Sequence, residues 1–362
     1  MDRMKVAISG LSYTQTHIRF FTDAPEIDLI LVQDINEDLA KRFASNYNVP
    51  VWSTDFNDIL ASGADIVFIA TPNHLHADMA VAALSAGKHV LSQKPIASTV
   101  ADGARMVSAA KASGKTLGIY QERLNAQYQT DLRKIVTGGY LGKIVSAHIR
   151  SASESAYNGK WAGNWRMEKE LTGGGALMMI GIHHLNNVQW LLNDSLESVM
   201  GYADTLYSDM TGEDIIAASG KFTSGALFTL QSSYCSLGSE LCIYGTEGRM
   251  QLLQKGLGEE TLFLYMEREF AGDTFSYQPV DDATKTMQEI DLGPIRSRRS
   301  EWEREHNQVR DYVRAVMNNQ VPTTTGEMGL RDLATAHAMY RSAQTGALVN
   351  VADFLEKSRK GS

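Results

Sequence analysis

The segment from residue 65 to residue 95 constrains the fold of this chain more than any other part of the sequence. It reads as an apolar run, a turn, a helix ended by Gly87, a second apolar run and a loop. Strand, helix and strand in that order form the repeating unit of a parallel sheet. The first run leads into Ala70-Thr71-Pro72-Asn73-His74, and the second leads into Gln93-Lys94-Pro95. Both loops therefore follow the carboxyl ends of strands, where open parallel sheets bind ligands.

Lys94 is the candidate functional residue of this segment. A lysine at the end of a strand, beside a proline, is placed to meet a substrate or a cofactor. The alternative is a solvated surface lysine next to a loop-ending proline, and an isolated Lys-Pro pair would favour it. The turn at residues 70–74 upstream favours the functional interpretation.

The pattern of segment 65–95 recurs throughout the first 121 residues. Strands are predicted at residues 5–9, 27–33, 66–70, 89–92 and 116–120, and helices at residues 37–47, 55–60, 77–86 and 99–112. The run at 27–33 is almost without polar interruption, which is typical of a strand buried on both faces by helices. Repeated strand-helix units predict a doubly wound parallel sheet.

Beyond Gln121 the pattern changes. The sequence first predicts a helix at 127–137, a long strand at 143–152 and, opened by a glycine run, a helix from about 176 to 192. Strands are then predicted at 196–203, 214–222, 226–234, 240–244, 250–253 and 262–266. Two helices follow, at 301–318 and 329–343. Consecutive strands with short turns predict antiparallel pairing. We therefore expect two domains, residues 1–121 and residues 122–362.

The bulk properties exclude several classes of protein. A net charge of −8 argues against general nucleic-acid binding, which needs a basic face. No apolar run approaches the roughly 20 residues of a membrane span, and the first strand begins too early to leave room for a signal peptide. Cys235 and Cys242 have neither zinc-site nor redox-motif spacing. We expect reduced thiols and a cytoplasmic protein.

The loop after the first strand is a candidate nucleotide site. A dinucleotide-binding loop carries G-x-G-x-x-G, whose glycines allow a tight turn and a close backbone approach to phosphate. Here Gly10 is present, Ser12 offers a hydroxyl group to phosphate, and Gln15 must splay the helix outward or point away. Taken alone, this loop favours an ordinary strand-to-helix turn.

The ends of the next two strands strengthen the nucleotide interpretation. Asp34 follows the second strand, where a carboxylate accepts hydrogen bonds from the adenosine ribose. Its charge would repel a 2′-phosphate, so the sequence favours NAD over NADP. The alternative role of Asp34 is a helix N-cap, and both roles can hold together. Thr71, Pro72 and Asn73 are expected to line the nicotinamide ribose and the pyrophosphate.

These motifs resemble the glucose-fructose oxidoreductase, inositol dehydrogenase and rhizopine-catabolism (Gfo/Idh/MocA) oxidoreductases. The resemblance covers nearly the whole chain and rests on residues 70–76 (ATPNHLH), 86–90 (AGKHV), 94–95 (KP), 139–145 (GYLGKIV), 173–177 (GGGAL), 181–183 (GIH) and 340–346 (YRSAQTG). It implies an α/β protein: an N-terminal Rossmann domain with a doubly wound parallel sheet, then a C-terminal α/β domain with a large, open, mainly antiparallel sheet. It also implies a nicotinamide cofactor, a sugar, cyclitol or related polyol substrate, and a homodimer or homotetramer assembled through the C-terminal sheet.

The resemblance also assigns roles to residues. The expected cofactor contacts are Gly10, Ser12, Tyr13, Asp34, Thr71, Pro72, Asn73, His76, Gln93 and Lys94. Lys94 matches the lysine of the family's Glu-Lys-Pro motif, and residues 179–183 match its Asp-x-Gly-x-His motif. His183 would accept the proton of the substrate hydroxyl group, and Lys94 would hold and polarise the same oxygen. A neutral imidazole titrates near pH 6.5 and suits such a base.

Three departures from the family pattern are present. The glycine loop is eroded at Ser12 and Gln15, Gln93 replaces the glutamate, and Met179 replaces the aspartate. The last two remove carboxylates, so Lys94 loses negative neighbours and His183 loses an orienting partner.

The expected substrate contacts are Lys94, Arg123, Trp161, Trp165, Arg166, His183 and Asn187. The two tryptophans offer flat apolar faces and Arg166 a polar tip, which together suit a sugar ring. The alternative for this tryptophan-rich loop is a hydrophobic patch in a subunit interface. For His183 the alternative is a buried histidine satisfied by the backbone. No histidine pair has a carboxylate at ligand spacing, so no metal site is expected.

The leading hypothesis is an NAD-dependent oxidoreductase acting on a sugar-like alcohol or its ketone. Gln93 and Met179 motivate a second hypothesis, a nucleotide-binding sensor or regulator without turnover. A third is NAD-assisted lyase or glycosidase chemistry, in which a transient oxidation activates elimination. No nucleic acid or membrane is expected as a partner.

Overall fold

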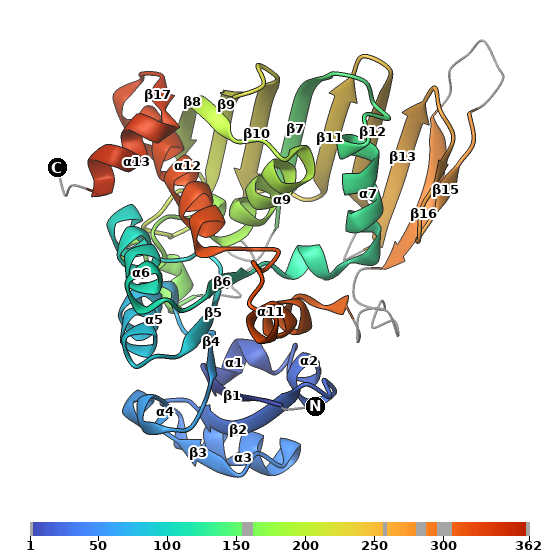
Figure 1. The fold of residues 1–362 in the computed structure, drawn as a ribbon. Coiled ribbons are helices and arrows are strands. Elements are labelled where there is room, and N and C mark those ends of the chain that lie inside the picture. The colour runs from blue at the N-terminus through green and yellow to red at the C-terminus, as the bar shows by residue number, and fades with distance from the viewer. Residues whose placement is uncertain (1–2, 154–161, 256–258, 280–286, 295–305, 360–362) are drawn as a thin grey trace. The chain divides into compact units, whose positions relative to one another are not determined.

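The computed structural model describes residues 3–153, 162–255, 259–279, 287–294 and 306–359 (Figure 1). By its contacts the chain separates into two units. The first unit comprises Met1–Asn125 and Glu301–Leu333, and the second comprises Ala126–Ser300 and Ala334–Ser358, apart from a few C-terminal residues. The domain boundary expected at Gln121 stays a prediction.

The first unit is built on a six-stranded sheet in the order β3-β2-β1-β4-β5-β6 (Figure 1). Its strands are β1 (Met4–Ser9), β2 (Ile27–Gln33), β3 (Val51–Ser53), β4 (Ile66–Ile69), β5 (His89–Gln93) and β6 (Leu117–Tyr120). Every pair is parallel, which confirms the predicted doubly wound sheet. The strand order reverses between β1 and β4, and ligands bind at such switch points.

The helices of this unit begin and end where local signals place them. They are α3 (Glu37–Tyr47), α4 (Phe56–Ala61), α5 (His76–Ser85) and α6 (Val100–Ser113). The side chain of Thr99 caps α6 by accepting from the Asp102 amide, and Gly114 ends it in the left-handed conformation. The first helical segment is interrupted: α1 (Leu11–Thr14) and α2 (Arg19–Thr22) are single turns separated by residues 15–18.

A helix from late in the chain belongs to this unit. It is α11 (Gln308–Met317), capped by Asn307, and it lies in the segment where the sequence predicts a helix at 301–318. The Tyr312 hydroxyl group lies 2.9 Å from the Val90 carbonyl oxygen and 2.8 Å from that of Thr116. Arg310 forms a two-point ion pair with Glu26, at 2.7 and 2.9 Å. These contacts bind α11 to the sheet strands and to the start of β2.

The second unit contains a nine-stranded sheet in the order β16-β13-β12-β11-β7-β10-β9-β8-β17 (Figure 1). Its strands are β7 (Ile144–Ala152), β8 (Leu196–Asp204), β9 (Ile215–Phe222), β10 (Leu227–Ser233), β11 (Ser239–Gly245), β12 (Gly248–Lys255), β13 (Glu259–Met266), β16 (Gln288–Pro294) and β17 (Val349–Asn350). The sheet is mainly antiparallel, as expected. One pair of strands that are not consecutive in the sequence is parallel, because β7 lies between β11 and β10 and runs parallel to β10.

Helices cover one face of this sheet. They include α7 (Gln127–Thr137) and α9 (Ile182–Leu192), which Figure 1 shows against the strands. The remaining α-helices among the described residues are the short α8 (Lys169–Thr172), α12 (Gly326–Thr345) and α13 (Val351–Arg359). Along β7, Ala147 and Ile149 are buried, whereas His148 and Arg150 are exposed. This alternation is that of a sheet with one packed face and one open face. No helix of the described residues is long and apolar enough to cross a membrane.

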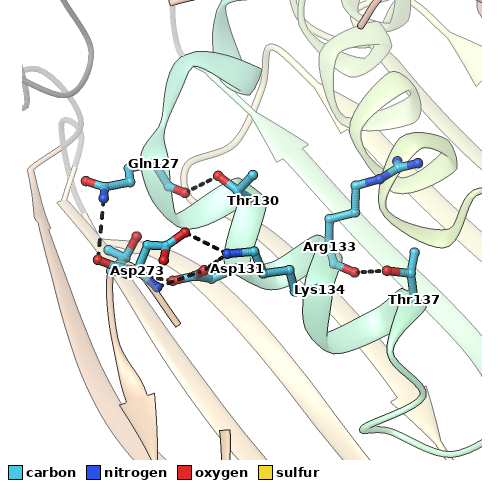
Figure 2. A network of polar contacts seen from close by, with 8 residues as sticks. Gln127, Thr130, Asp131, Arg133, Lys134, Thr137 and Asp273 are labelled. Atoms are coloured by element: carbon cyan, nitrogen blue, oxygen red, sulfur yellow. Dashed lines mark hydrogen bonds and ion pairs between the residues drawn. The ribbon is translucent and has the colours of Figure 1, made fainter. Parts of the chain in front are cut away.

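A polar network fixes α7 to the strands beside it (Figure 2). The fully buried Asp131 accepts hydrogen bonds from the backbone amides of Asp273 (3.1 Å) and Thr274 (2.7 Å). These residues lie in the loop that joins β14 (Phe270–Ala271) to β15 (Ser276–Tyr277). Lys134 pairs with the Asp273 carboxylate at 2.6 Å. At the other side of the helix, the Arg133 guanidinium lies over the ring of Trp190, on α9.

Candidate active site

The loops after β1 and β4 approach each other closely at Gly10. This residue follows β1 with φ of +88°, a conformation that favours glycine. A Cβ atom at this position would lie 2.5 Å from the carbonyl carbon of Ala70. The loops after β1 and β4 therefore touch backbone to backbone, as the first glycine of a dinucleotide loop requires.

The residues after Gly10 show how the chain accommodates the missing glycines. Ser12 and Gln15 are exposed, and Tyr13 is half-buried with its ring centroid 4.9 Å from that of His17. Gln15 stands just beyond the last residue of α1 rather than within a longer helix. Its larger side chain is thus accommodated by an interrupted helix and an outward position.

Asp34 is bonded to the same loop. Its carboxylate accepts hydrogen bonds from the amides of Leu11 (2.8 Å) and Asn36 (3.0 Å). The N-cap of α3 is Asn36, whose side chain accepts from the Leu39 amide, so the alternative role of Asp34 as helix cap is wrong. A carboxylate has about four acceptor positions, which leaves capacity for ribose hydroxyl groups.

His76 ties together the loops that follow β4 and β5. Its Nδ1 lies 2.9 Å from the Pro95 carbonyl oxygen and its Nε2 lies 2.9 Å from that of Thr71. Burial lowers the pKa of His76, whereas the two carbonyl contacts act in the opposite direction. The ring is only 1% exposed, so the structure places this expected cofactor contact beneath the surface, as a support for Thr71 and Pro95.

The remaining expected contacts of this edge lie at the ends of the same strands. Thr71 and Pro72 are half-buried and Asn73 is buried. Gln93, at the end of β5, accepts from the Lys94 amide at 3.2 Å. The Gln93 Nε2 atom is buried, with no hydrogen-bond partner among the described residues. Lys94 itself is half-buried.

The first unit therefore fits a nicotinamide dinucleotide. Gly10 gives the close turn, Asp34 gives a carboxylate beside it, and the amide of Gln93 is a buried donor without a described partner at the neighbouring strand end. All three lie at carboxyl ends of strands, on both sides of the switch point. This is the edge at which doubly wound sheets bind nucleotides.

In the second unit the glycine run packs against two residues from distant parts of the chain. A Cβ atom on Gly174 would lie 2.2 Å from the Tyr340 hydroxyl oxygen, and one on Gly175 would lie 1.8 Å from the Glu213 carbonyl oxygen. The amides of Gly175 and Leu177 donate to the Glu213 carboxylate at 2.7 and 2.9 Å. Sequence reasoning missed Glu213 and Tyr340, because glycines signal a close approach without naming the partner.

The segment after the glycines carries Met179 and His183. It begins with a π-helical turn, Leu177–Gly181, and continues as α9. Such turns are frequent at functional sites. Met179 packs with Met167 and Ile180 against a buried apolar cluster of Ala176, Met210 and Tyr234. The position of the family's aspartate is therefore an apolar environment in this chain, which suits methionine and disfavours a charge.

Several expected substrate contacts lie in this unit. His183 is half-buried, while Asn187, one turn further along α9, is only 2% exposed. The Arg166 guanidinium lies 4.7 Å from the ring centroid of Trp165, within the 3₁₀ turn Trp165–Met167. Asn164 holds this turn by accepting from the amide of Arg166 at 3.1 Å.

The structure brings some of these residues together. Met167, the last residue of the turn that carries Trp165 and Arg166, packs in the same cluster as Met179. Arg123 is half-buried in the 3₁₀ turn Glu122–Asn125 of the first unit. Trp161 lies outside the described residues.

Comparison with known proteins gives matches along both units. Residues 4–121 match the NAD-binding Rossmann-fold domain of an oxidoreductase family, and residues 133–351 match the C-terminal alpha/beta domain of the same family. The chain is 29% identical to a 1,5-anhydro-D-fructose reductase of Ensifer adhaerens, over 79% of this chain and 80% of the relative. It is 26% identical to an NADP⁺-dependent D-xylose 1-dehydrogenase of Haloarcula marismortui, over 82% and 78% of the two chains.

A solved structure supports the same assignment. An aldose-aldose oxidoreductase from Caulobacter crescentus, complexed with glycerol, superposes with a TM-score of 0.79 at 26% identity, covering 96% of this chain and 99% of the other. The family domains account for most of both units, including the switch-point loops and the glycine run. The chain therefore belongs to the Gfo/Idh/MocA family of oxidoreductases.

Proposed function

We propose that this chain is an NAD-dependent oxidoreductase that interconverts a hydroxyl group and a carbonyl group on a sugar, cyclitol or related polyol. The observation that carries the proposal is the loop at the switch point, where Gly10 meets Ala70 and Asp34 accepts from the Leu11 amide. The relatives whose names identify sugars and sugar derivatives as substrates support the substrate class.

The choice of NAD over NADP rests on Asp34. In either cofactor the bound nicotinamide ring would accept or supply the hydride, so the two cofactors differ only at the adenosine ribose. A carboxylate beside this ribose accepts hydrogen bonds from both hydroxyl groups and repels a 2′-phosphate. One of the relatives uses NADP⁺, so the relative affinities of this chain for NADH and NADPH test the preference.

We assign the proton chemistry to Lys94 and His183. The Lys94 ammonium group would donate to the reacting oxygen and stabilise its negative charge. The His183 imidazole would take the hydroxyl proton during oxidation and return it during reduction. Trp165 and Arg166 would hold the sugar, the first through its apolar face and the second through hydrogen bonds.

Cofactor binding and turnover are tested in sequence. NADH fluorescence should change on titration with the purified chain, and NADPH should bind more weakly. A panel containing 1,5-anhydro-D-fructose, D-xylose and inositols should then reveal at least one substrate whose conversion changes nicotinamide absorbance. Fluorescence that stays constant up to millimolar NADH would remove the proposal.

The other hypotheses give different results in the same assays. A sensor without turnover would bind NADH and leave the absorbance constant across the panel. A lyase or glycosidase would release an aglycone or an elimination product without net change in NADH. Gln93 and Met179, which stand at the positions of two family carboxylates, are the reason to run these arms.

We further propose a cytoplasmic homodimer or homotetramer assembled through the open face of the nine-stranded sheet. Exposed apolar side chains lie on this sheet, among them Met200 and Tyr202 of β8 and Tyr244 of β11. These three also line a shallow hollow of about 620 Å³ on that face. Sedimentation equilibrium should give the mass of two or four chains, and the mass of a single chain at micromolar concentration would contradict the proposal.

A further inference from the structure

We propose that Glu213 is a positioning residue for His183. Its carboxylate accepts hydrogen bonds from the start of the helical segment that carries the imidazole, and in this way it fixes where the imidazole lies. This inference rests on the role of His183 proposed above. Glu213 itself is assigned no contact with substrate or cofactor. It lies two residues before the start of β9, and the residue it is inferred to position lies on the helix that follows the glycine run.

Glu213 holds the start of this segment through three hydrogen bonds and is itself held by a fourth, from Tyr340 on α12. Its carboxylate oxygens accept from the amides of Gly175 (2.7 Å) and Leu177 (2.9 Å), and its own carbonyl oxygen accepts from the amide of Ala176 (2.9 Å). The Tyr340 hydroxyl group donates to the same carboxylate at 2.7 Å. Three consecutive amides at the helix start therefore bond to one residue.

The glycine run allows the backbone to come close enough to Glu213 for these hydrogen bonds. Any side chain at Gly175 would meet the Glu213 backbone at 1.8 Å, and any side chain at Gly174 would meet Tyr340 at 2.2 Å. The π-helical turn then leads directly into α9 without a break. Because the segment is continuous, the position of its first residues sets the direction in which the His183 side chain points.

The charge of Glu213 also has no substitute on the helix. Residues 177–192 contain no aspartate or glutamate, and position 179, acidic in the family, is methionine in an apolar cluster. The amides of Gly175 and Leu177 and the hydroxyl group of Tyr340 all donate to the carboxylate, which favours its ionised form. Burial nevertheless raises the pKa of Glu213, and these hydrogen bonds act in the opposite direction. The ionised carboxylate therefore depends on each of the three hydrogen bonds.

The test uses the full-length chain with ¹³C-labelled histidine Cε1 atoms. His183→Gln assigns the His183 signal by its disappearance. In Glu213→Gln the amide oxygen can accept from one backbone amide, but its NH₂ group faces the other. We expect the His183 signal to shift and its titration midpoint to move by about half a pH unit or more, while the signal of His148, on the open face of the sheet, stays in place.

Kinetics on the best substrate of the panel gives a second measure. A displaced catalytic group of about 1 Å costs on the order of 100-fold in rate, so we expect kcat to fall by about that factor in Glu213→Gln. The dissociation constant of NADH should stay within about twofold, because the cofactor contacts proposed above are in the first unit. A loss confined to KM would contradict a positioning role.

Asp214→Asn is the matched control. Asp214 is the adjacent carboxylate, and it accepts from the amides of Leu206, Tyr207 and Ser208 rather than from the helix. Its replacement likewise turns one of two accepting oxygens into an NH₂ group that faces backbone amides, and it should leave the His183 signal unchanged. Equal shifts in Glu213→Gln and Asp214→Asn would mean that both act only on general stability, which overturns the inference.

A second variant tests the inference if Glu213→Gln does not fold. Tyr340→Phe removes a single donor to the carboxylate and leaves both backbone contacts in place. We expect a smaller His183 shift in this variant. An unchanged His183 signal in the folded Glu213→Gln, or in Tyr340→Phe if only that variant folds, overturns the inference. Turnover that survives in His183→Gln would instead reject the proposed role of the histidine, whatever Glu213 does to its signal.

Discussion

Replacing Lys94 with alanine should lower kcat by about 1,000-fold while NADH binding stays measurable. The ammonium group is the part of the loop that can donate to the reacting oxygen and offset its negative charge. The loop itself is held by other contacts, since His76 meets the Pro95 carbonyl oxygen and Gln93 accepts from the Lys94 amide. The side chain can therefore be removed without releasing the backbone.

Stopped-flow and steady-state absorbance measurements on the best polyol substrate give kcat, and fluorescence titration gives the dissociation constant of NADH. Lys111→Ala serves as the control, because Lys111 is exposed on α6 and pairs with Glu327 at 3.5 Å. It should behave as the unmodified chain does in both assays. A Lys94→Ala enzyme that keeps more than about a tenth of the activity would remove Lys94 from the proton chemistry.

Replacing Gly10 with alanine should weaken NADH binding by roughly 5-fold to 150-fold. A residue other than glycine at φ of +88° costs on the order of 1–3 kcal/mol, and each 1.4 kcal/mol is about tenfold in affinity. The new Cβ atom would also meet the Ala70 carbonyl carbon at 2.5 Å, so the loops after β1 and β4 must separate. That separation displaces the backbone proposed to approach the pyrophosphate.

The control for Gly10→Ala is Gly114→Ala. Gly114 ends α6 with φ of +65°, and a Cβ atom there would meet nothing within 4 Å. This variant carries the left-handed strain without the clash, so it should lose about 1 kcal/mol of unfolding free energy and bind NADH normally. If Gly10→Ala folds and binds NADH as tightly as Gly114→Ala, the switch-point loop is not the pyrophosphate site.

Local patterns predicted most elements of the fold. The runs at 27–33 and 37–47 coincide with β2 and α3, because the apolar period of a strand or helix is set by its own backbone geometry. Cap residues also gave boundaries, as Thr99 does for α6. The pattern was less informative where several residues competed for one role: Asn36, and not Asp34, caps α3.

Pairings between distant segments were not predictable in the same way. The position of β7 between β11 and β10 depends on which strand edges fit together, and the order of strands in the sequence does not encode this. The attachment of α11 to the first unit depends on Tyr312 and on the Arg310–Glu26 pair, whose partners lie hundreds of positions earlier. Such contacts depend on complementary shape and charge between segments.

For the candidate site the division is the same. The sequence by itself determined the doubly wound sheet, the motif residues at its carboxyl edge and the family, because strand-helix periodicity and short motifs are local. The tertiary structure decided that Glu213 accepts hydrogen bonds from the glycine run and from Tyr340, and that Met179 packs in an apolar cluster. Those features depend on which side chains the folded chain brings together, and no local pattern of residues carries that information.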